Sequence, residues 1–150
     1  LMRWLIGQEV VEVSGMSNKI LTADSSYKFD DMIMNLLRFE KGTLGRSMSN
    51  LGPQRTKIHG LNVYGTKQTF VNDIPHARLF SGDQSHQETT ITTPYPGVDK
   101  FDLIPDFVSA IEENRQPAVP LTDIFRVMDI CFACYDSLAA QRTIPVTYLI

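Results

Sequence analysis

Residues 122–141 read TDIFRVMDICFACYDSLAAQ, the longest uninterrupted periodic run in this chain of 150 residues. Its apolar side chains recur every three or four positions, which is the spacing of one side of an α-helix. These residues are Ile124, Val127, Met128, Cys131, Cys134, Tyr135 and Leu138, and the opposite side carries Arg126, Asp129, Asp136 and Ser137. The run therefore predicts an amphipathic helix that packs on the rest of the domain through its apolar side, with Thr122 as its N-cap.

The segments next to this helix predict a second helix and a terminal strand. Residues 103–114 have helical periodicity, with Asp102 placed to cap them and with Phe107, Val108 and Ile111 facing inward. The β-branched residues of 144–150, which follow the long helix, favour a strand. A helix that leads directly into a strand needs a sheet to pack on.

The first two thirds of the chain read as strands and turns. Gly42 and Gly65 mark two hairpin turns, and residues 31–39 carry apolar side chains on both faces, which is typical of a central strand. Strands are predicted at residues 9–16, 31–39, 44–51, 57–64, 68–72, 77–80 and 88–92. The order of strands followed by helices predicts an α+β fold, a largely antiparallel open β-sheet with helices packed on one face.

Composition restricts the class of protein. A chain of 150 residues that is 43% hydrophobic and 21% charged can bury the core of one globular domain. The formal net charge of -3 gives no reason to expect a nucleic acid or a membrane as partner. No apolar run is long enough to span a bilayer, and two cysteines are too few for a disulfide scaffold. We therefore expect a cytoplasmic location.

The cysteines and two Asp/His pairs are weak candidates for chemistry. Cys131 and Cys134 have the spacing of a redox pair, but they fall in the middle of the predicted helix on its apolar side, so we expect unreactive core residues. Asp73 with His76, and Asp83 with His86, lack a distinctive ligand spacing. We predict no metal site.

Several segments, taken in order, resemble the C-terminal domain of the glucose-fructose oxidoreductase and inositol dehydrogenase family (Gfo/Idh/MocA). They are the helix end Trp4-Leu5-Ile6-Gly7 with the valine-rich strand after it, residues 37–42, 63–67 and 107–111, and the closing residues 117–146. The resemblance covers nearly the whole chain. It implies that residues 1–150 are a single domain that contributes substrate cleft and subunit contact to a two-domain enzyme. An N-terminal Rossmann domain of that enzyme would bind NAD or NADP.

The resemblance places most of the chemistry upstream of Leu1. The glycine-rich loop, the lysine of a Glu-Lys-Pro motif and an Asp-x-x-x-His pair would all precede this sequence, which contains no G-x-G-x-x-G after a strand. The chain also lacks an initiator methionine, so we expect a fragment of a longer protein. We predict no catalytic and no cofactor-binding residues here, and no activity for this chain alone. One departure from the family is Gln68, which stands where a second turn glycine is usual.

Arg55, Lys57 and His59 are the candidate substrate-binding residues. In the resembled family the segment at 54–57 approaches the cleft, and two cations there would suit a carboxylate or phosphate. The alternative is a solvated loop.

The prediction for function is the C-terminal domain of an NAD(P)-dependent oxidoreductase that acts on a sugar, cyclitol or related alcohol. The resemblance also implies a homo-oligomer formed through the open sheet face. The alternatives are a non-catalytic binding or assembly module, and an unrelated α+β enzyme. The sequence does not distinguish NAD from NADP.

Overall fold

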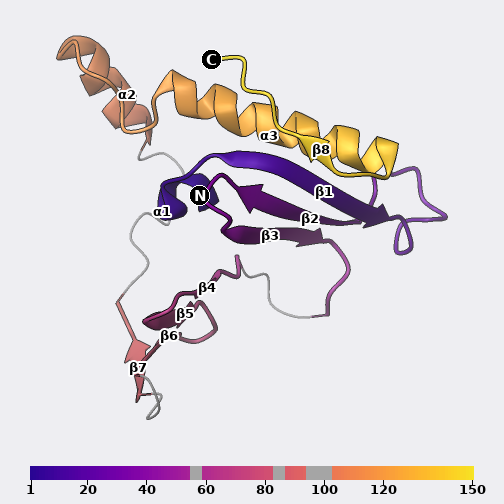
Figure 1. The fold of residues 1–150 in the computed structure, drawn as a ribbon, viewed down its shortest axis with the longest axis horizontal. Coiled ribbons are helices and arrows are strands. Elements are labelled where there is room, and N and C mark those ends of the chain that lie inside the picture. The colour runs from indigo at the N-terminus through magenta and orange to yellow at the C-terminus, as the bar shows by residue number, and fades with distance from the viewer. Residues whose placement is uncertain (55–58, 83–86, 94–102) are drawn as a thin grey trace. The chain divides into compact units, whose positions relative to one another are not determined.

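The computed structural model describes residues 1–54, 59–82, 87–93 and 103–150. They form two compact units (Figure 1). Unit 1 comprises Leu1–Pro53 and Leu103–Ile150, and unit 2 comprises Gln54–Asp102.

Unit 1 is built on a four-stranded antiparallel sheet in the order β3-β2-β1-β8. The strands are β1 (Val10–Asn18), β2 (Met32–Phe39), β3 (Leu44–Asn50) and β8 (Ile144–Pro145). The predicted central position of residues 31–39 is confirmed, because β2 pairs with a strand on each side. Gly42 closes the β2–β3 hairpin with φ +87, a left-handed conformation that glycine adopts without strain.

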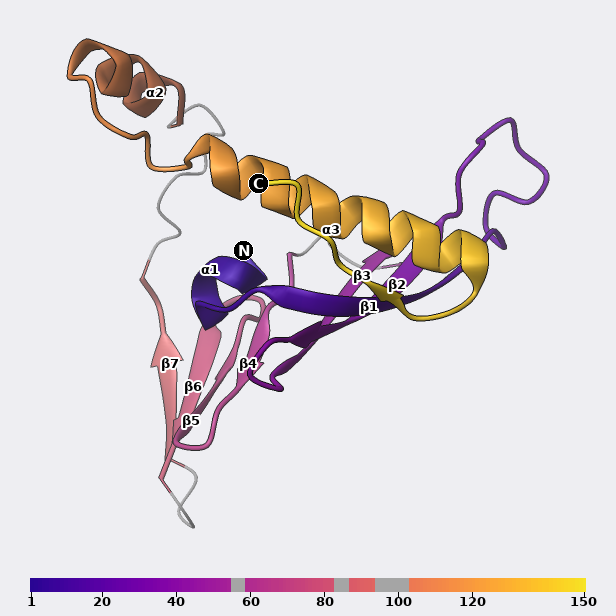
Figure 2. The ribbon, with the colours of Figure 1, turned by 45° about the horizontal axis from the view of Figure 1, so that its top comes forward.

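Three helices complete unit 1: α1 (Met2–Ile6), α2 (Leu103–Glu112) and α3 (Leu121–Ala140). The helix α1 ends at Gly7 with φ 65, as the sequence predicted. Figure 2 shows α3 running along β1 on one face of the sheet. The core between them consists of Val10, Val13, Leu37, Phe39 and Ala133. The predicted α+β class, with open antiparallel sheet and helices on one face, is confirmed.

The orientation of α3 about its axis differs from the prediction. Its buried residues are Asp129, Ala133 and Ser137, whereas Ile124 and Tyr135 are 48% and 70% exposed. The predicted inward side was therefore wrong for most of its residues, although Cys134 does pack against the core. The reason is that small side chains allow a close approach to β1, where the Ser137 hydroxyl accepts a hydrogen bond from the Gly15 amide at 2.9 Å.

The predicted caps and ends of the helices also need correction. Thr122 lies inside α3, which begins after Pro120 with no side-chain cap. In α2 only Ala110 is buried, and Phe107, Val108 and Ile111 are exposed, so their predicted inward packing was wrong. Asp102 lies outside the described residues. The predicted strand at 144–150 is reduced to the two residues of β8.

Unit 2 is an antiparallel meander of β4 (Asn62–Tyr64), β5 (Gln68–Val71), β6 (Ala77–Ser81) and β7 (Gln87–Ile91). The described part of the chain thus forms two sheets. The β4–β5 turn closes through a 2.9 Å hydrogen bond from the Gly65 amide to the Gln68 carbonyl, and neither Thr66 nor Lys67 has a positive φ. This turn therefore does not need a second glycine.

No helix within the described ranges has the length and apolar character needed to cross a membrane.

Candidate functional site

The predicted substrate-binding residues are only partly within the described structure. Arg55 and Lys57 lie outside the described residues. His59 is exposed, and its backbone carbonyl accepts a hydrogen bond from the Asn72 side-chain amide at 2.9 Å. Their role as a group stays a prediction.

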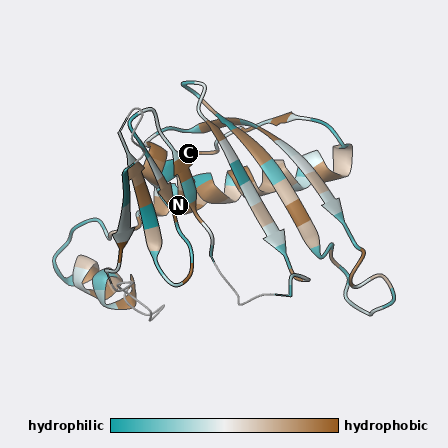
Figure 3. Ribbon diagram, turned by 90° about the horizontal axis from the view of Figure 1, so that it is seen from below, coloured by the Kyte–Doolittle hydropathy of each residue, from teal (hydrophilic) through white to brown (hydrophobic). Residues whose placement is uncertain are grey.

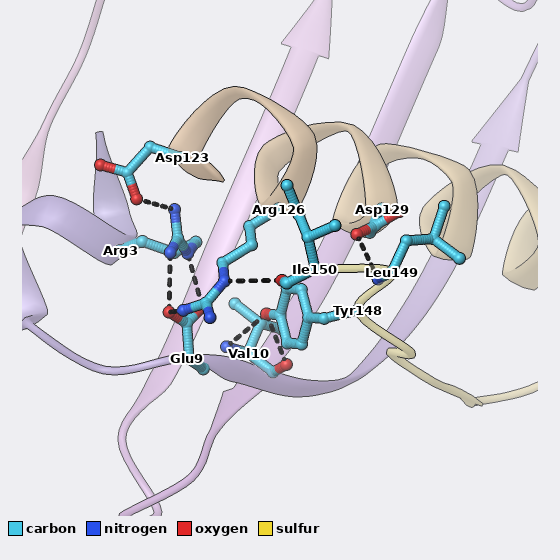
Figure 4. A network of polar contacts seen from close by, with 9 residues as sticks. All are labelled: Arg3, Glu9, Val10, Asp123, Arg126, Asp129, Tyr148, Leu149 and Ile150. Carbon is cyan, nitrogen blue, oxygen red and sulfur yellow. Dashed lines mark hydrogen bonds and ion pairs between the residues drawn. The ribbon is translucent and has the colours of Figure 1, made fainter. Parts of the chain in front are cut away.

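The main concentration of charge in unit 1 surrounds Glu9, at the junction of α1, β1 and α3 (Figure 4). Arg3 donates to both carboxylate oxygens of Glu9 at 2.6 and 2.7 Å, and Arg126 donates a third bond at 2.8 Å. Arg3 also reaches Asp123 in the first turn of α3 at 3.2 Å. The fork of Arg3 thus ties α1 to both the start of β1 and the start of α3.

The same cluster holds the C-terminal tail. Arg126 donates to the Ile150 carbonyl at 3.1 Å, and its guanidinium lies 5.7 Å from the centre of the Tyr148 ring. The Tyr148 hydroxyl donates to the Val10 carbonyl at 2.8 Å and accepts from the Val10 amide at 3.0 Å. Asp129 accepts from the Leu149 amide at 3.1 Å. We call these residues, with Arg3, Glu9 and Asp123, the anchoring network.

The electrostatics of the anchoring network make it unreactive near neutral pH. The hydrogen bonds from Arg3, together with that from Arg126, lower the pKa of Glu9 to about 2. The hydrogen bonds to Glu9 raise the pKa of Arg3 above its ordinary value. Burial raises the pKa of Tyr148 to about 12. None of these three groups exchanges a proton near pH 7, so Arg3, Glu9 and Tyr148 stabilise structure and are poorly suited to act as a general acid or base.

The cysteines differ from the prediction in one respect. Cys131 is exposed and Cys134 is half-buried, so the expectation of a core position was wrong for Cys131. Burial, with a smaller contribution from Cys131, raises the pKa of Cys134 to about 11. Cys134 is therefore a thiol at neutral pH and a poor nucleophile.

The described residues contain no cluster of three or more His, Cys, Asp or Glu side chains that could hold a metal. Of the two predicted weak pairs, Asp73 forms an ion pair with Arg78 at 3.3 Å. Asp83 and His86 lie outside the described residues.

The surface of the described residues includes two shallow hollows that could be considered as sites. One of about 420 Å³ lies at the end of α2, and Arg115, its charged lining residue, already pairs with Asp106 and Glu113. Another of about 280 Å³ lies beside the β4–β5 turn and has Lys67 as its charged lining residue. Neither brings together the opposed polar groups of a reactive site.

Sequence reasoning did not identify the anchoring network, because it assigned Arg126 and Asp129 to the solvent side of the long helix. One signal was present. A three-and-four spacing also links Arg126, Asp129, Ala133 and Ser137. Such a side of small and polar residues can pack on a sheet when its polar groups have hydrogen-bond partners.

Comparisons with known proteins agree with this architecture. Among solved structures, levoglucosan dehydrogenase in complex with NADH and levoglucosan matches with a TM-score of 0.78 and 20% identity, over 98% of this chain and 47% of that one. An oxidoreductase domain protein from Kribbella flavida matches with 0.77 and 18%, over 97% and 47% of the two chains. Aldose-aldose oxidoreductase from Caulobacter crescentus, complexed with glycerol, matches with 0.75 and 18%, over 96% and 43%.

This chain therefore spans less than half the length of these proteins. A search of curated protein sequences found no match. The sequence profile of the family described as "Oxidoreductase family, C-terminal alpha/beta domain" matches residues 1–147, which confirms the resemblance to Gfo/Idh/MocA proteins. The chain belongs to this oxidoreductase family and forms its C-terminal α/β domain.

Proposed function

We propose that this chain is the C-terminal half of an NAD(P)-dependent oxidoreductase that acts on a sugar, cyclitol or related alcohol. The observation that carries the proposal is the family match over residues 1–147. It is supported by the similarity of fold to levoglucosan dehydrogenase with NADH and levoglucosan and to aldose-aldose oxidoreductase with glycerol. We assign the protein to the cytoplasm as part of the same proposal.

In this proposal, a Rossmann half upstream of Leu1 binds the nicotinamide cofactor. The chain contributes a fixed platform on which the catalytic helix of the enzyme ends. The resemblance places an Asp-x-x-x-His pair on the helix that ends at α1, and the fork of Arg3 ties α1 to Glu9 and Asp123 at 2.6 to 3.2 Å. Arg3 and Glu9 are thus positioning residues, because they set the angle at which the catalytic helix leaves the domain.

Arg55, Lys57 and His59 are proposed to contact the substrate. The support is the resemblance, which brings this segment to the cleft, and the suitability of two cations for a carboxylate or phosphate group. Arg55→Gln and Lys57→Gln should each raise the KM of the complete enzyme about tenfold with little change in kcat, as loss of uniform binding does. Lys41→Gln, at an exposed hairpin turn, is the matched control. An unchanged KM in both variants would remove the segment from the site.

The open face of the unit 1 sheet is proposed as the contact between subunits of a homo-oligomer. Met16 pairs with Met34, and Met34 pairs with Met48, so three methionines form a row across β1, β2 and β3 on one face. Met16 and Met48 are 79% and 53% exposed. Figure 3 shows hydrophobic residues mixed with hydrophilic ones along the strands. Such a face suits pairing of identical surfaces about a two-fold axis.

Two measurements test the proposal. Calorimetry with NADH and NADPH on the complete protein should give micromolar binding, whereas the 150-residue chain should bind neither, because the resemblance places the phosphate-binding helix upstream. A complete protein that binds neither would favour a binding or assembly module. Light scattering over a dilution series should give a dimer mass that Met48→Glu reduces to that of a monomer. A monomer mass at high concentration would reject the sheet contact.

A further inference from the structure

The two faces of the unit 2 sheet differ in chemistry. The opposite sides of its strands are distinguished by the register, and one face carries mostly apolar side chains, namely Val63, Phe70, Ala77, Leu79 and Ile91. The other face carries Asn62, Tyr64, Thr69, Val71, Arg78, Phe80, Glu88 and Thr90. We call this second set the polar face. An antiparallel sheet packs through its apolar face, so the polar face is the one that meets water or a ligand.

One row of the polar face crosses all four strands. It consists of Tyr64, Thr69, Phe80 and Glu88, each paired with the next in register. Side chains stand roughly perpendicular to a sheet, and adjacent strands lie about 4.8 Å apart. The two aromatic residues are therefore separated by about 10 Å, with the Thr69 hydroxyl between them. Tyr64 is 77% exposed, so its ring is available to a ligand.

Neighbouring side chains hold both aromatic rings in place. The Asn62 side-chain amide lies 3.5 Å from the Tyr64 hydroxyl, and the Arg78 guanidinium lies 5.5 Å from the centre of the Phe80 ring. Arg78 is held in turn by its ion pair with Asp73 at 3.3 Å. The rings are thus oriented before a ligand arrives, which reduces the conformational entropy that binding would cost.

The hollow of about 280 Å³ beside the β4–β5 turn adjoins this row. Thr69 and Phe80 belong to both, and the remaining lining residues are Gly65, Thr66, Lys67, Gln68, Ser81 and Gly82. The lining supplies an aromatic ring, hydroxyl groups, an amide and an ammonium group. Such a set can donate and accept hydrogen bonds around an apolar surface, which is the composition of a small-molecule site.

The charges around the hollow favour a neutral ligand. Lys67 and Arg78 are cations and Asp73 and Glu88 are carboxylates, so their formal charges cancel. A phosphate group near Phe80 would meet Glu88, its register partner, as well as Lys67. A sugar ring fits better, because its C–H groups can lie against the negative face of an aromatic ring while its hydroxyl groups bond both donors and acceptors.

We propose that the polar face of unit 2 binds a monosaccharide ring over Thr69, against the rings of Tyr64 and Phe80, with its hydroxyl groups bonded to Lys67 and Glu88. This inference goes beyond the proposed function, because it assigns to this chain a ligand-binding activity that needs no nicotinamide cofactor. The turn residues of the hollow are exposed. A small ligand at such an open site should bind with a dissociation constant in the millimolar range.

Titration of the isotope-labelled 150-residue chain with D-glucose, followed by NMR, tests the site. The backbone amide signals of Thr69, Phe80 and Ser81 should shift and reach saturation. Phe80→Leu keeps an apolar side chain but removes the aromatic face, so it should weaken binding at least about fivefold. The matched control is Phe70→Leu, the same change to a half-buried ring on the opposite face of the same sheet, which should leave the dissociation constant unchanged.

Tyr64→Ala is a second variant that should weaken binding, and it should not affect folding because the side chain is 77% exposed. Absence of a saturable shift with D-glucose would overturn the inference, and so would equal losses in Phe80→Leu and Phe70→Leu. Sodium phosphate is the other arm of the titration, and shifts with phosphate but not with D-glucose would identify an anion site instead. Because the titration contains no cofactor, its outcome is independent of the NADH test of the proposed function.

Discussion

The two sides of α3 differ in polarity in the opposite sense to the one that their positions would suggest. The side against the sheet carries Asp129, Ala133 and Ser137, all buried, whereas the outer side carries Ile124 and Tyr135, both exposed. The inner side is held by hydrogen bonds and by close approach to β1. The outer side has the larger apolar side chains and nothing within unit 1 to cover them.

This difference shows what determines burial in this domain. A polar side chain can be buried when each of its groups has a partner, and the Ser137 hydroxyl has two, the Gly15 amide at 2.9 Å and the Arg142 carbonyl at 2.6 Å. Large apolar side chains would hold the helix farther from the sheet. The inner side therefore sets the geometry of unit 1.

The largest expected effect comes from a matched pair of alanines on α3. Ala133 is 6% exposed against the sheet, and Ala139 is exposed on the same helix. Ala133→Leu should lower the free energy of unfolding by about 2–3 kcal/mol, because the added atoms have no space, whereas Ala139→Leu should change it by less than about 0.5 kcal/mol. Urea denaturation of both variants measures this. Equal effects would mean that the two sides do not differ in packing.

The second prediction concerns the anchoring network and its dependence on pH. Glu9→Gln should lower the free energy of unfolding at pH 7 by about 2 kcal/mol, a value reduced for partial exposure of the carboxylate. The pKa of Glu9 is lowered from 4.5 to about 2, so its contribution is complete above pH 4.5 and is lost as the pH falls through about 2. Denaturation of wild type and variant should therefore converge between these values.

The control for this prediction is the ion pair between Glu12 and Arg38 on the open sheet face, whose side chains are 39% and 55% exposed. Glu12→Gln should cost less than about 0.5 kcal/mol at pH 7, because water and salt screen such a pair. A cost for Glu12→Gln as large as that for Glu9→Gln would contradict the view that the anchoring network stabilises the domain more than an ion pair on the sheet surface does.

Much of the fold could be predicted because its signals are local. The turn glycine Gly42, the helix end at Gly7, and the two apolar faces of residues 31–39 each report local backbone geometry or a central strand, and the structure confirms them. The order of strands and helices was enough for the fold class. These features depend on neighbours in sequence, which a single sequence displays.

The rotation of α3 and the anchoring network could not be predicted because they depend on contacts distant in sequence. Arg126 meets Glu9 across 117 residues, and Tyr148 meets Val10 across 138. Hydrophobic periodicity correctly located a helix, but it assumes that the most apolar side faces the protein's own core. That assumption fails for α3, whose small and polar side packs on the sheet while its larger apolar side chains are exposed.

The third prediction tests the polar contact between α3 and β1. Ser137→Ala removes the acceptor of the Gly15 amide and the donor to the Arg142 carbonyl, so it should lower the free energy of unfolding by about 1.5 kcal/mol. Cys131→Ala, on the outer side of the same helix, should cost less than about 0.5 kcal/mol. Hydrogen exchange at the Gly15 amide, faster in Ser137→Ala than in Cys131→Ala, would locate the loss. Unchanged protection at Gly15 would contradict the bond.

The smallest expected effect is on the outer side of α3. Met128 is 44% exposed, so Met128→Gln in the 150-residue chain should change the free energy of unfolding by less than about 0.5 kcal/mol. Thermal denaturation of wild type and variant measures this change. A loss as large as that of Ser137→Ala would mean that the outer side of α3 contributes to the packing of unit 1 as the inner side does.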